Sequence, residues 1–268
     1  ITIGQSSALN WSVTGATGLN IDKIGAVTAT GMQITPSADT DYVLTATNEF
    51  GSAQANASIA VFQPPKSWFA PLGNIVDPAY GSVDYSALFN STSPWSMAAS
   101  HIQVFKLYAV MLTLPDADLM NLFADLKRRH IAVALEWGPL VPGVCGNGVE
   151  GFDGSEGLRW AQRIRDTGGS LQYLAFDEPF FYGAMYNGAS ACHWTPDQVA
   201  QDAAAHTADI RSIFPDVVVG DIEVVPAAFV ASDWLDRYQA WIDAWQKATG
   251  TPLAFFDFDT DMNSDWRP

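Results

Sequence analysis

The stretch LQYLAFDEP, residues 171–179, joins a short, mostly apolar run to two acidic residues and a proline. A bounded apolar run of this length is typical of a strand buried in a parallel sheet. Similar runs occur at five other places along the chain, at 68–72, 102–108, 131–137, 217–224 and 253–259. The sequence therefore predicts six strands, of which 171–177 is the fourth.

Helical patterns separate these runs. Helices are predicted at 119–129, 156–167, 196–214 and 233–249. Strands that alternate with helices favour an α/β fold, a TIM-type (β/α) barrel, and no Gly-x-Gly-x-x-Gly follows any strand to indicate a dinucleotide site. About 200 residues follow position 65, whereas a complete barrel takes about 250. Either the last two βα units lie outside this sequence, or the barrel is irregular or incomplete.

The first 62 residues have a different pattern. Short β-like runs alternate with turn residues, which predicts a small all-β sandwich. The segments LNWSV (9–13), IGAV (24–27), TDYVLTATN (40–48) and FG (50–51) resemble the bacterial immunoglobulin-like modules attached to secreted and surface enzymes. Two prolines make 63–66 a stiff linker. The predicted domains are thus a sandwich at 1–62, a linker at 63–66 and a catalytic barrel at 67–268.

Composition and charge narrow the classes of function. The chain carries 13 Lys and Arg against 29 Asp and Glu, a net charge of −16, which argues against nucleic acid and acidic membranes as partners. No apolar window approaches the roughly 18 residues of a membrane span. Scarce lysines, strong acidity and ten Trp favour a secreted or cell-surface bacterial protein, expected to be a monomer. Because Ile1 begins on strand-like sequence, we expect any signal peptide to have been removed.

Acidic residues gather where the predicted strands end. They are Glu136, Asp177, Glu178, Asp221, Glu223, Asp257 and Asp259. The carboxyl ends of barrel strands form the catalytic face, so we expect these side chains to converge over one cleft. Glu178 is the leading candidate for a general acid, because the aromatic residues that follow it provide apolar surroundings that raise a carboxyl pKa. The structural alternative is that Glu178 caps a helix or pairs with Lys106 or Arg267.

The motif Asp177-Glu178-Pro179 resembles the Asn-Glu-Pro signature of retaining glycoside hydrolases with (β/α)8 barrels, the clan of cellulases, mannanases and β-galactosidases. This resemblance implies that Glu178 is the acid/base. Asp177 stands in place of the usual Asn, so a carboxylate replaces the amide that contacts the sugar. The clan nucleophile follows a seventh strand, which this sequence does not contain. Glu223 and Asp257 are therefore the candidates for the second carboxylate, as nucleophile or as base.

Other residues at the same edge suit a sugar cleft. The substrate-binding candidates are Lys106, Tyr108, Glu136, Trp137, Asp177, Tyr182, Asp221 and Asp259. For Lys106 a structural ion pair is an equal alternative. Cys145 and Cys192 follow the third and fourth strands, neighbours in a barrel, and are predicted to form a disulfide.

Metal and cofactor sites lack support in the sequence. The acidic residues from 257 to 265 alternate as in a calcium loop, but the sixth position has no Gly and Pro268 occupies the twelfth. We predict no metal and no cofactor. The predicted function is a secreted glycoside hydrolase that cleaves a poly- or oligosaccharide by carboxylate acid/base catalysis. Two alternatives stay open: a non-catalytic carbohydrate-binding protein with a degenerate barrel, and a metal-dependent barrel isomerase or lyase.

Overall fold

The chain divides into two compact units in the computed structural model, Ile1–Lys66 and Ser67–Pro268. The structure describes residues 1, 3–61, 66–71, 88–89, 95–227 and 230–260. Most of the predicted linker, residues 63–65, and the acidic stretch after Thr260, with Arg267, lie outside the described residues. No helix in the described part of the chain is both long enough and apolar enough to cross a membrane.

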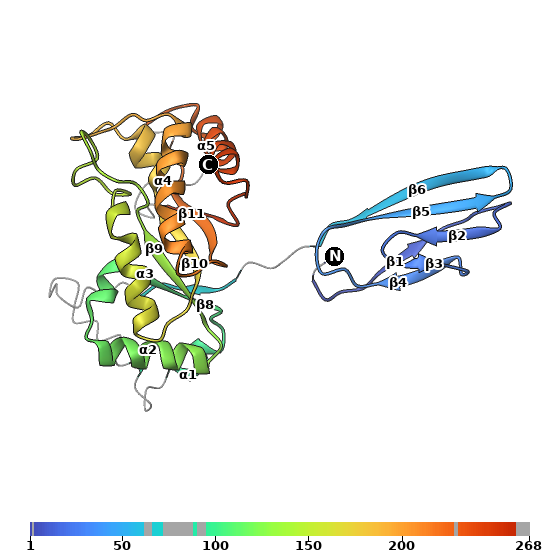
Figure 1. The fold of residues 1–268 in the computed structure, drawn as a ribbon, viewed down its shortest axis with the longest axis horizontal. Helices are drawn as coiled ribbons and strands as arrows, with labels where there is room; N and C mark the ends of the chain where they lie inside the picture. The colour runs from blue at the N-terminus through green and yellow to red at the C-terminus, as the bar shows by residue number, and fades with distance from the viewer. Residues whose placement is uncertain (2, 62–65, 72–87, 90–94, 228–229, 261–268) are drawn as a thin grey trace. The chain divides into compact units, whose positions relative to one another are not determined.

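The first unit is built from antiparallel strands (Figure 1). β1 (Ser7–Asn10) pairs with β4 (Gly31–Ile34), and a second sheet has the order β3 (Gly25–Ala26), β2 (Gly18–Ile21), β5 (Thr40–Asn48), β6 (Gly51–Ile59). This arrangement fits the predicted all-β module. The immunoglobulin-like resemblance stays a prediction.

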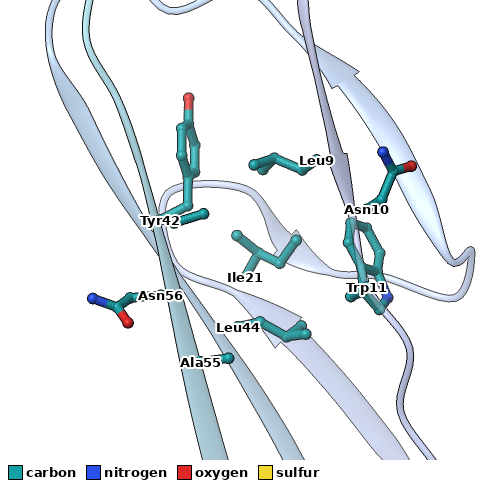
Figure 2. A pocket seen from close by; sticks show the side chains of 9 residues that line it. Leu9, Asn10, Trp11, Ile21, Tyr42, Leu44, Ala55 and Asn56 are labelled. Carbon is teal, nitrogen blue, oxygen red and sulfur yellow. The ribbon is translucent and has the colours of Figure 1, made fainter.

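The core of this unit lies beside a small open pocket. Leu9, Ile21, Ile34 and Tyr42 are the buried apolar residues of the core, and Trp11 packs against them. The pocket has a volume of about 90 Å³. Its lining, drawn in Figure 2, combines core side chains with the exposed residues Asn10 and Asn56, so the pocket opens to solvent at the edge of the core.

The second unit is built on a parallel sheet of six strands. They are β7 (Trp68–Phe69), β8 (Val104–Tyr108), β9 (Ala132–Trp137), β10 (Leu171–Asp177), β11 (Val218–Val224) and β12 (Phe256–Asp259). Their spatial order follows their order in the chain, as in the wall of a (β/α) barrel. The predicted α/β class and the six parallel strands are confirmed, and the described sheet corresponds to an incomplete barrel.

Helices connect these strands (Figure 1). The α-helices are α1 (Ser96–Ala99), α2 (Asp116–Arg128), α3 (Gly157–Asp166), α4 (Pro196–Arg211) and α5 (Trp234–Thr249), and the shorter turns are η3 (Ala109–Thr113), η4 (Gly154–Glu156) and the π-helical η5 (Phe181–Met185). Thr195 caps α4 by accepting a hydrogen bond from the Gln198 N–H, and Gly250 ends α5 in the left-handed conformation.

The two faces of the sheet differ in character. Phe176 of β10 contacts Trp245 of α5. Asp221, which pairs with Phe176 on the neighbouring strand β11, is bonded to Trp241 of the same helix. The face that carries Phe176 and Asp221 is called here the helix face. Side chains alternate along a strand, so the residues on either side of these two belong to the other face, called here the inner face. Near its amino-terminal end the inner face carries Trp68, Tyr173 and Phe255 in mutual ring contact. Toward the carboxyl-terminal ends of the strands, the inner face carries charged side chains instead.

Candidate functional site

The residue that follows β10 has an unusual backbone. Glu178 has φ +49°, in the left-handed region that non-glycine residues adopt at a cost of about 1–3 kcal/mol. Its N–H donates to the Ile222 carbonyl at 3.0 Å, and its carbonyl accepts from the Tyr182 N–H at 3.0 Å. The side chain is only 4% exposed. The predicted general acid is thus buried at a strained turn that neighbouring segments hold.

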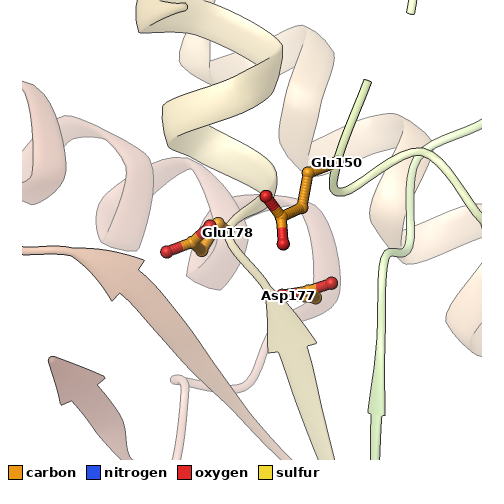
Figure 3. Close-up of side chains that lie close together, drawn as sticks. All are labelled: Glu150, Asp177 and Glu178. Carbon is orange, nitrogen blue, oxygen red and sulfur yellow. The ribbon is translucent and has the colours of Figure 1, made fainter. Parts of the chain in front are cut away.

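Three carboxylates meet at this turn. One oxygen each from Glu150, Asp177 and Glu178 lies within 4.8 Å of the others. Figure 3 shows Asp177 at the end of β10 and Glu150 extending toward it from the loop that follows β9. Asp259, at the end of β12, is close enough to interact electrostatically with the Glu178 side chain. The cluster therefore draws its carboxylates from β10, from β12 and from the loop after β9.

Burial and mutual repulsion keep two of these groups protonated. Burial, followed by the charges of Glu150, Asp177 and Asp259, raises the pKa of Glu178 to about 9. Burial, with Glu136 and Glu150, raises the pKa of Asp177 to about 8. A carboxyl of this kind holds a proton at neutral pH, which is the state that a general acid needs.

An ion pair lies beside the cluster on the inner face. Lys106 and Glu136 are bonded to each other, and their side chains are 15% and 14% exposed. The ammonium group also lies 5.0 Å from the centre of the Tyr108 ring. Burial raises the pKa of Glu136, although the Lys106 charge opposes this. Of the two interpretations of Lys106, the structure shows the ion pair.

Tyr182 lies at the cluster, on the π-helical turn η5. Burial, together with the nearby Glu150 carboxylate, raises the pKa of its phenol. Its ring contacts Tyr186 at a centroid distance of 5.3 Å. Asp257 and Asp259 are exposed and belong to the inner face, because Asp257 pairs with Ile222, which in turn pairs with Asp177. Tyr182, Asp257 and Asp259 thus lie at the carboxyl-terminal edge of the sheet, where the sequence analysis expects them.

Three predicted residues face the helices instead. Trp137, Asp221 and Glu223 are fully or almost fully buried. The Trp137 indole donates to the Asp153 carbonyl, and its ring is 2% exposed and contacts Phe176, so its face is covered. Asp221 accepts from the indole N–H of Trp241 at 2.6 Å. Glu223 accepts two backbone N–H bonds. Alternation along the strand turns these three side chains to the helix face in this structure, away from the edge where the sequence analysis expects them.

Two loops at the site are joined covalently. Cys145 and Cys192 form a disulfide with a Cα separation of 5.2 Å. The first follows β9 and the second follows β10, so the bond links the loop that carries Glu150 to the loop before α4. Next to Glu150, Gly151 has φ +80°, and a Cβ there would lie 3.0 Å from the Asp177 carbonyl oxygen. Close backbone packing therefore sets the position of Glu150.

Sequence reasoning missed Glu150. It sits in a loop of more than ten residues between β9 and η4, where no periodicity fixes the direction of a side chain. One signal was present: the loop follows a strand end, and Gly148 and Gly151 around Glu150 indicate tight turns.

The same three carboxylates are the residues that could hold a cation. Carboxylate oxygens are the ligands that Ca²⁺ and Mg²⁺ prefer. Of the other acids at the strand ends, Asp221 and Glu223 are buried on the helix face and lie outside this set. Among the described residues, metal binding here would depend on Glu150, Asp177 and Glu178.

Comparison with known proteins gives weak likenesses. No family model and no curated protein matches the chain. Among solved structures, the Ignisphaera aggregans GH53 catalytic domain aligns with a TM-score of 0.40 at 8% identity over 60% of this chain and 49% of that one. Bacteroides uniformis beta-glucuronidase 3 gives 0.36 at 8% over 81% and 30%.

An endo-1,4-beta-mannanase from Eisenia fetida gives a TM-score of 0.38 at 12% identity, over 72% of this chain and 65% of that one. The chain spans about half of the GH53 domain and less than a third of the glucuronidase. Likeness at these scores carries no argument about activity, which leaves the side chains of the inner face as the basis for a function. The similar structures include barrel glycoside hydrolases and also a D-psicose 3-epimerase, which gives a TM-score of 0.38 at 11% identity over 74% of this chain and 74% of that one.

Proposed function

We propose that this protein is a glycoside hydrolase that cleaves a poly- or oligosaccharide, with Glu178 as general acid. The observation that carries the proposal is the Glu178 carboxyl, which is buried at the end of β10 among other carboxylates and has a pKa raised to about 9. Its place at the carboxyl end of a parallel strand is where barrel enzymes hold their catalytic groups.

The chemistry needs one proton donor and one further carboxylate. The Glu178 carboxyl gives its proton to the glycosidic oxygen as the bond from that oxygen to the anomeric carbon breaks. The second carboxylate comes from β12, where we propose Asp257, two residues before Asp259, whose charge helps to raise the pKa of Glu178. It either attacks the anomeric carbon, forming an ester that water then cleaves, or removes a proton from the attacking water.

The surrounding side chains suit recognition of sugar hydroxyls. Lys106, Tyr108, Glu136, Asp177 and Tyr182 are proposed as contacts, since carboxylates accept from hydroxyls and the phenols present ring faces to a sugar. The acidic balance of this face favours a neutral substrate over an acidic one. The disulfide supports an oxidising compartment, hence secretion or display at the cell surface.

The test is hydrolysis of a panel of neutral polysaccharides, measured as new reducing ends. The wild-type chain is expected to cleave at least one of them, and Glu178→Gln is expected to lose at least about 10²-fold in rate, because an amide cannot deliver the proton. Glu156→Gln is the matched control, since Glu156 is an exposed glutamate paired with Arg159 on α3. Glycan binding without hydrolysis by the wild-type chain would instead favour the non-catalytic carbohydrate-binding protein.

A second candidate function rests on the carboxylate cluster. Glu150, Asp177 and Glu178 offer three oxygens close enough to share a divalent cation, as a metal-dependent isomerase or lyase would require. Adding Mg²⁺, Mn²⁺ or Ca²⁺ to chelator-treated protein separates the two functions. The hydrolase is expected to keep its rate without metal, whereas activity that returns only with a cation would favour the isomerase or lyase.

A further inference from the structure

Glu223 makes an unusual pair of contacts on the helix face. One carboxylate oxygen accepts the backbone N–H of Phe180 at 2.7 Å, and the other accepts that of Phe181 at 3.0 Å. The side chain has no exposed surface. Both donors belong to the first residues after Glu178-Pro179. A buried acid of β11 therefore accepts hydrogen bonds from the backbone immediately after the proposed general acid.

Side-chain packing holds one side of this turn, because Phe180 and Phe181 are almost fully buried and the Phe180 ring stacks on Trp241. The backbone of the turn needs hydrogen-bond acceptors as well. Glu178 is in the left-handed region, which costs free energy unless surrounding bonds compensate. Pro179 has no N–H, so Phe180 and Phe181 supply the first backbone donors after Glu178. The first N–H groups of a helical turn have no partner within it and need acceptors from elsewhere. The Glu223 carboxyl accepts from two of them, although burial raises its pKa.

Strand β11 fixes the turn at three points in all. The Ile222 carbonyl accepts the Glu178 N–H at 3.0 Å, and the next residue, Glu223, accepts the other two. The backbone of β11 therefore aligns the start of the turn and the Glu223 side chain aligns its end. The Glu178 side chain emerges between these points onto the inner face.

We propose that Glu223 is a positioning residue for Glu178: it touches no substrate and holds the turn from which the Glu178 carboxyl is presented. This inference rests on the proposed function only for its effect on rate. The requirement is specific to a carboxyl group, because both of its oxygens accept backbone N–H bonds. A glutamine in the same place has one acceptor, and its NH₂ group would face a backbone N–H.

Asp221 provides a matched control. It lies two residues earlier on the same strand, faces the same side and is equally buried. Its bond goes to the indole N–H of Trp241 in α5 and not to a backbone N–H of the 178–181 turn, although the Trp241 ring stacks on Phe180. Asp221→Asn thus makes the same chemical change in the core without removing a hydrogen-bond acceptor of the turn.

The experiment compares Glu223→Gln with Asp221→Asn in the full chain by steady-state kinetics, thermal unfolding and hydrogen–deuterium exchange. Both variants are expected to unfold at lower temperature. For Glu223→Gln we expect kcat to fall by about 10²-fold with KM little changed, because the bound sugar is held by other residues while the acid is misplaced. Asp221→Asn is expected to keep kcat near the wild-type value. In Glu223→Gln alone, exchange at the 180–182 amides is expected to become faster.

Equal kcat for Glu223→Gln and the wild type, or equal losses in the two variants, would overturn the proposal. If Glu223→Gln does not fold, hydrogen–deuterium exchange at the Phe180 and Phe181 amides of the wild-type chain tests the proposal. Protection as strong as that of the β11 amides supports the two hydrogen bonds to Glu223, and exchange as fast as in exposed loops refutes them. Amide exchange measures the hydrogen bonds of the turn whether or not any sugar is cleaved. An inactive wild-type chain would therefore contradict the hydrolase proposal without affecting this test.

Discussion

At the level of single residues, Glu178 and Asp177 link the site to the pH dependence of stability. Their ordinary pKa values of 4.5 and 3.8 are raised to about 9 and about 8 in the folded chain. Between the ordinary and the raised pKa values of these two carboxyls, the folded state holds more protons than the unfolded state. Their contribution to the free energy of unfolding is therefore greatest below about pH 4 and falls as the pH rises toward 9.

The resulting prediction is that the unfolding midpoint of the wild-type chain falls between pH 5 and pH 9, and that Glu178→Gln falls less because one titrating group is gone. Thermal unfolding followed by circular dichroism across this range measures it. The exposed control Glu156→Gln should follow the wild-type slope. A Glu178→Gln slope equal to that of the wild type would contradict the raised pKa.

The residues also show what sequence could and could not predict. The place of Glu178 is predictable because it follows an apolar run that ends abruptly, which marks a strand end. Asp221 and Glu223 lie within the last residues of a similar run, but proximity to the strand end says nothing about which face a side chain takes. That is set by the pairing register, which the sequence of one strand does not contain.

At the level of elements, the loop between β9 and η4 decides where Glu150 lies. Gly151 packs against the Asp177 carbonyl, whereas Gly148, also left-handed at φ +70°, has nothing within 4 Å of a Cβ position. Alanine at either position is strained by its backbone angle, but only at Gly151 does it also collide with the turn.

Gly148→Ala is therefore expected to lower the free energy of unfolding by about 1 kcal/mol with activity retained. Gly151→Ala should cost more and also reduce the hydrolysis rate, since the collision moves either Glu150 or the 177–179 turn. Urea unfolding and initial rates on the same two variants measure both effects. Identical behaviour of the two variants would show that the close approach at Gly151 has no part in the site.

The elements themselves were largely predictable. Each parallel strand lies within its predicted run, since buried strands are short apolar segments between turn signals. The helix predicted at 119–129 begins earlier, at Asp116, directly after Pro115. Apolar spacing starts only at Leu119, whereas the first turn of a helix accepts acidic residues such as Asp116 and Asp118.

At the level of the whole molecule, the groups of the proposed site come from one unit. Lys106, Glu150, Glu178 and Asp259 all belong to Ser67–Pro268. A chain that begins at Lys66 is therefore expected to prefer the same polysaccharide as the full chain, with any change confined to stability or attachment. Relative rates on a polysaccharide panel test this. A different preferred polysaccharide would show that residues 1–65 contribute to the site.

The central claim is that Glu178 protonates the leaving oxygen, and its most direct test is the dependence of rate on the leaving group. Glycosides of the preferred sugar with different leaving groups are compared in the wild type and in Glu178→Gln. Dinitrophenolate leaves without being protonated, whereas the methoxy group of a methyl glycoside leaves only after it receives a proton. We expect a loss of about 10²–10⁴-fold for the methyl glycoside and little loss for the dinitrophenyl glycoside. An equal loss for every leaving group would contradict the account, because Glu178 would then act in some way other than by proton donation.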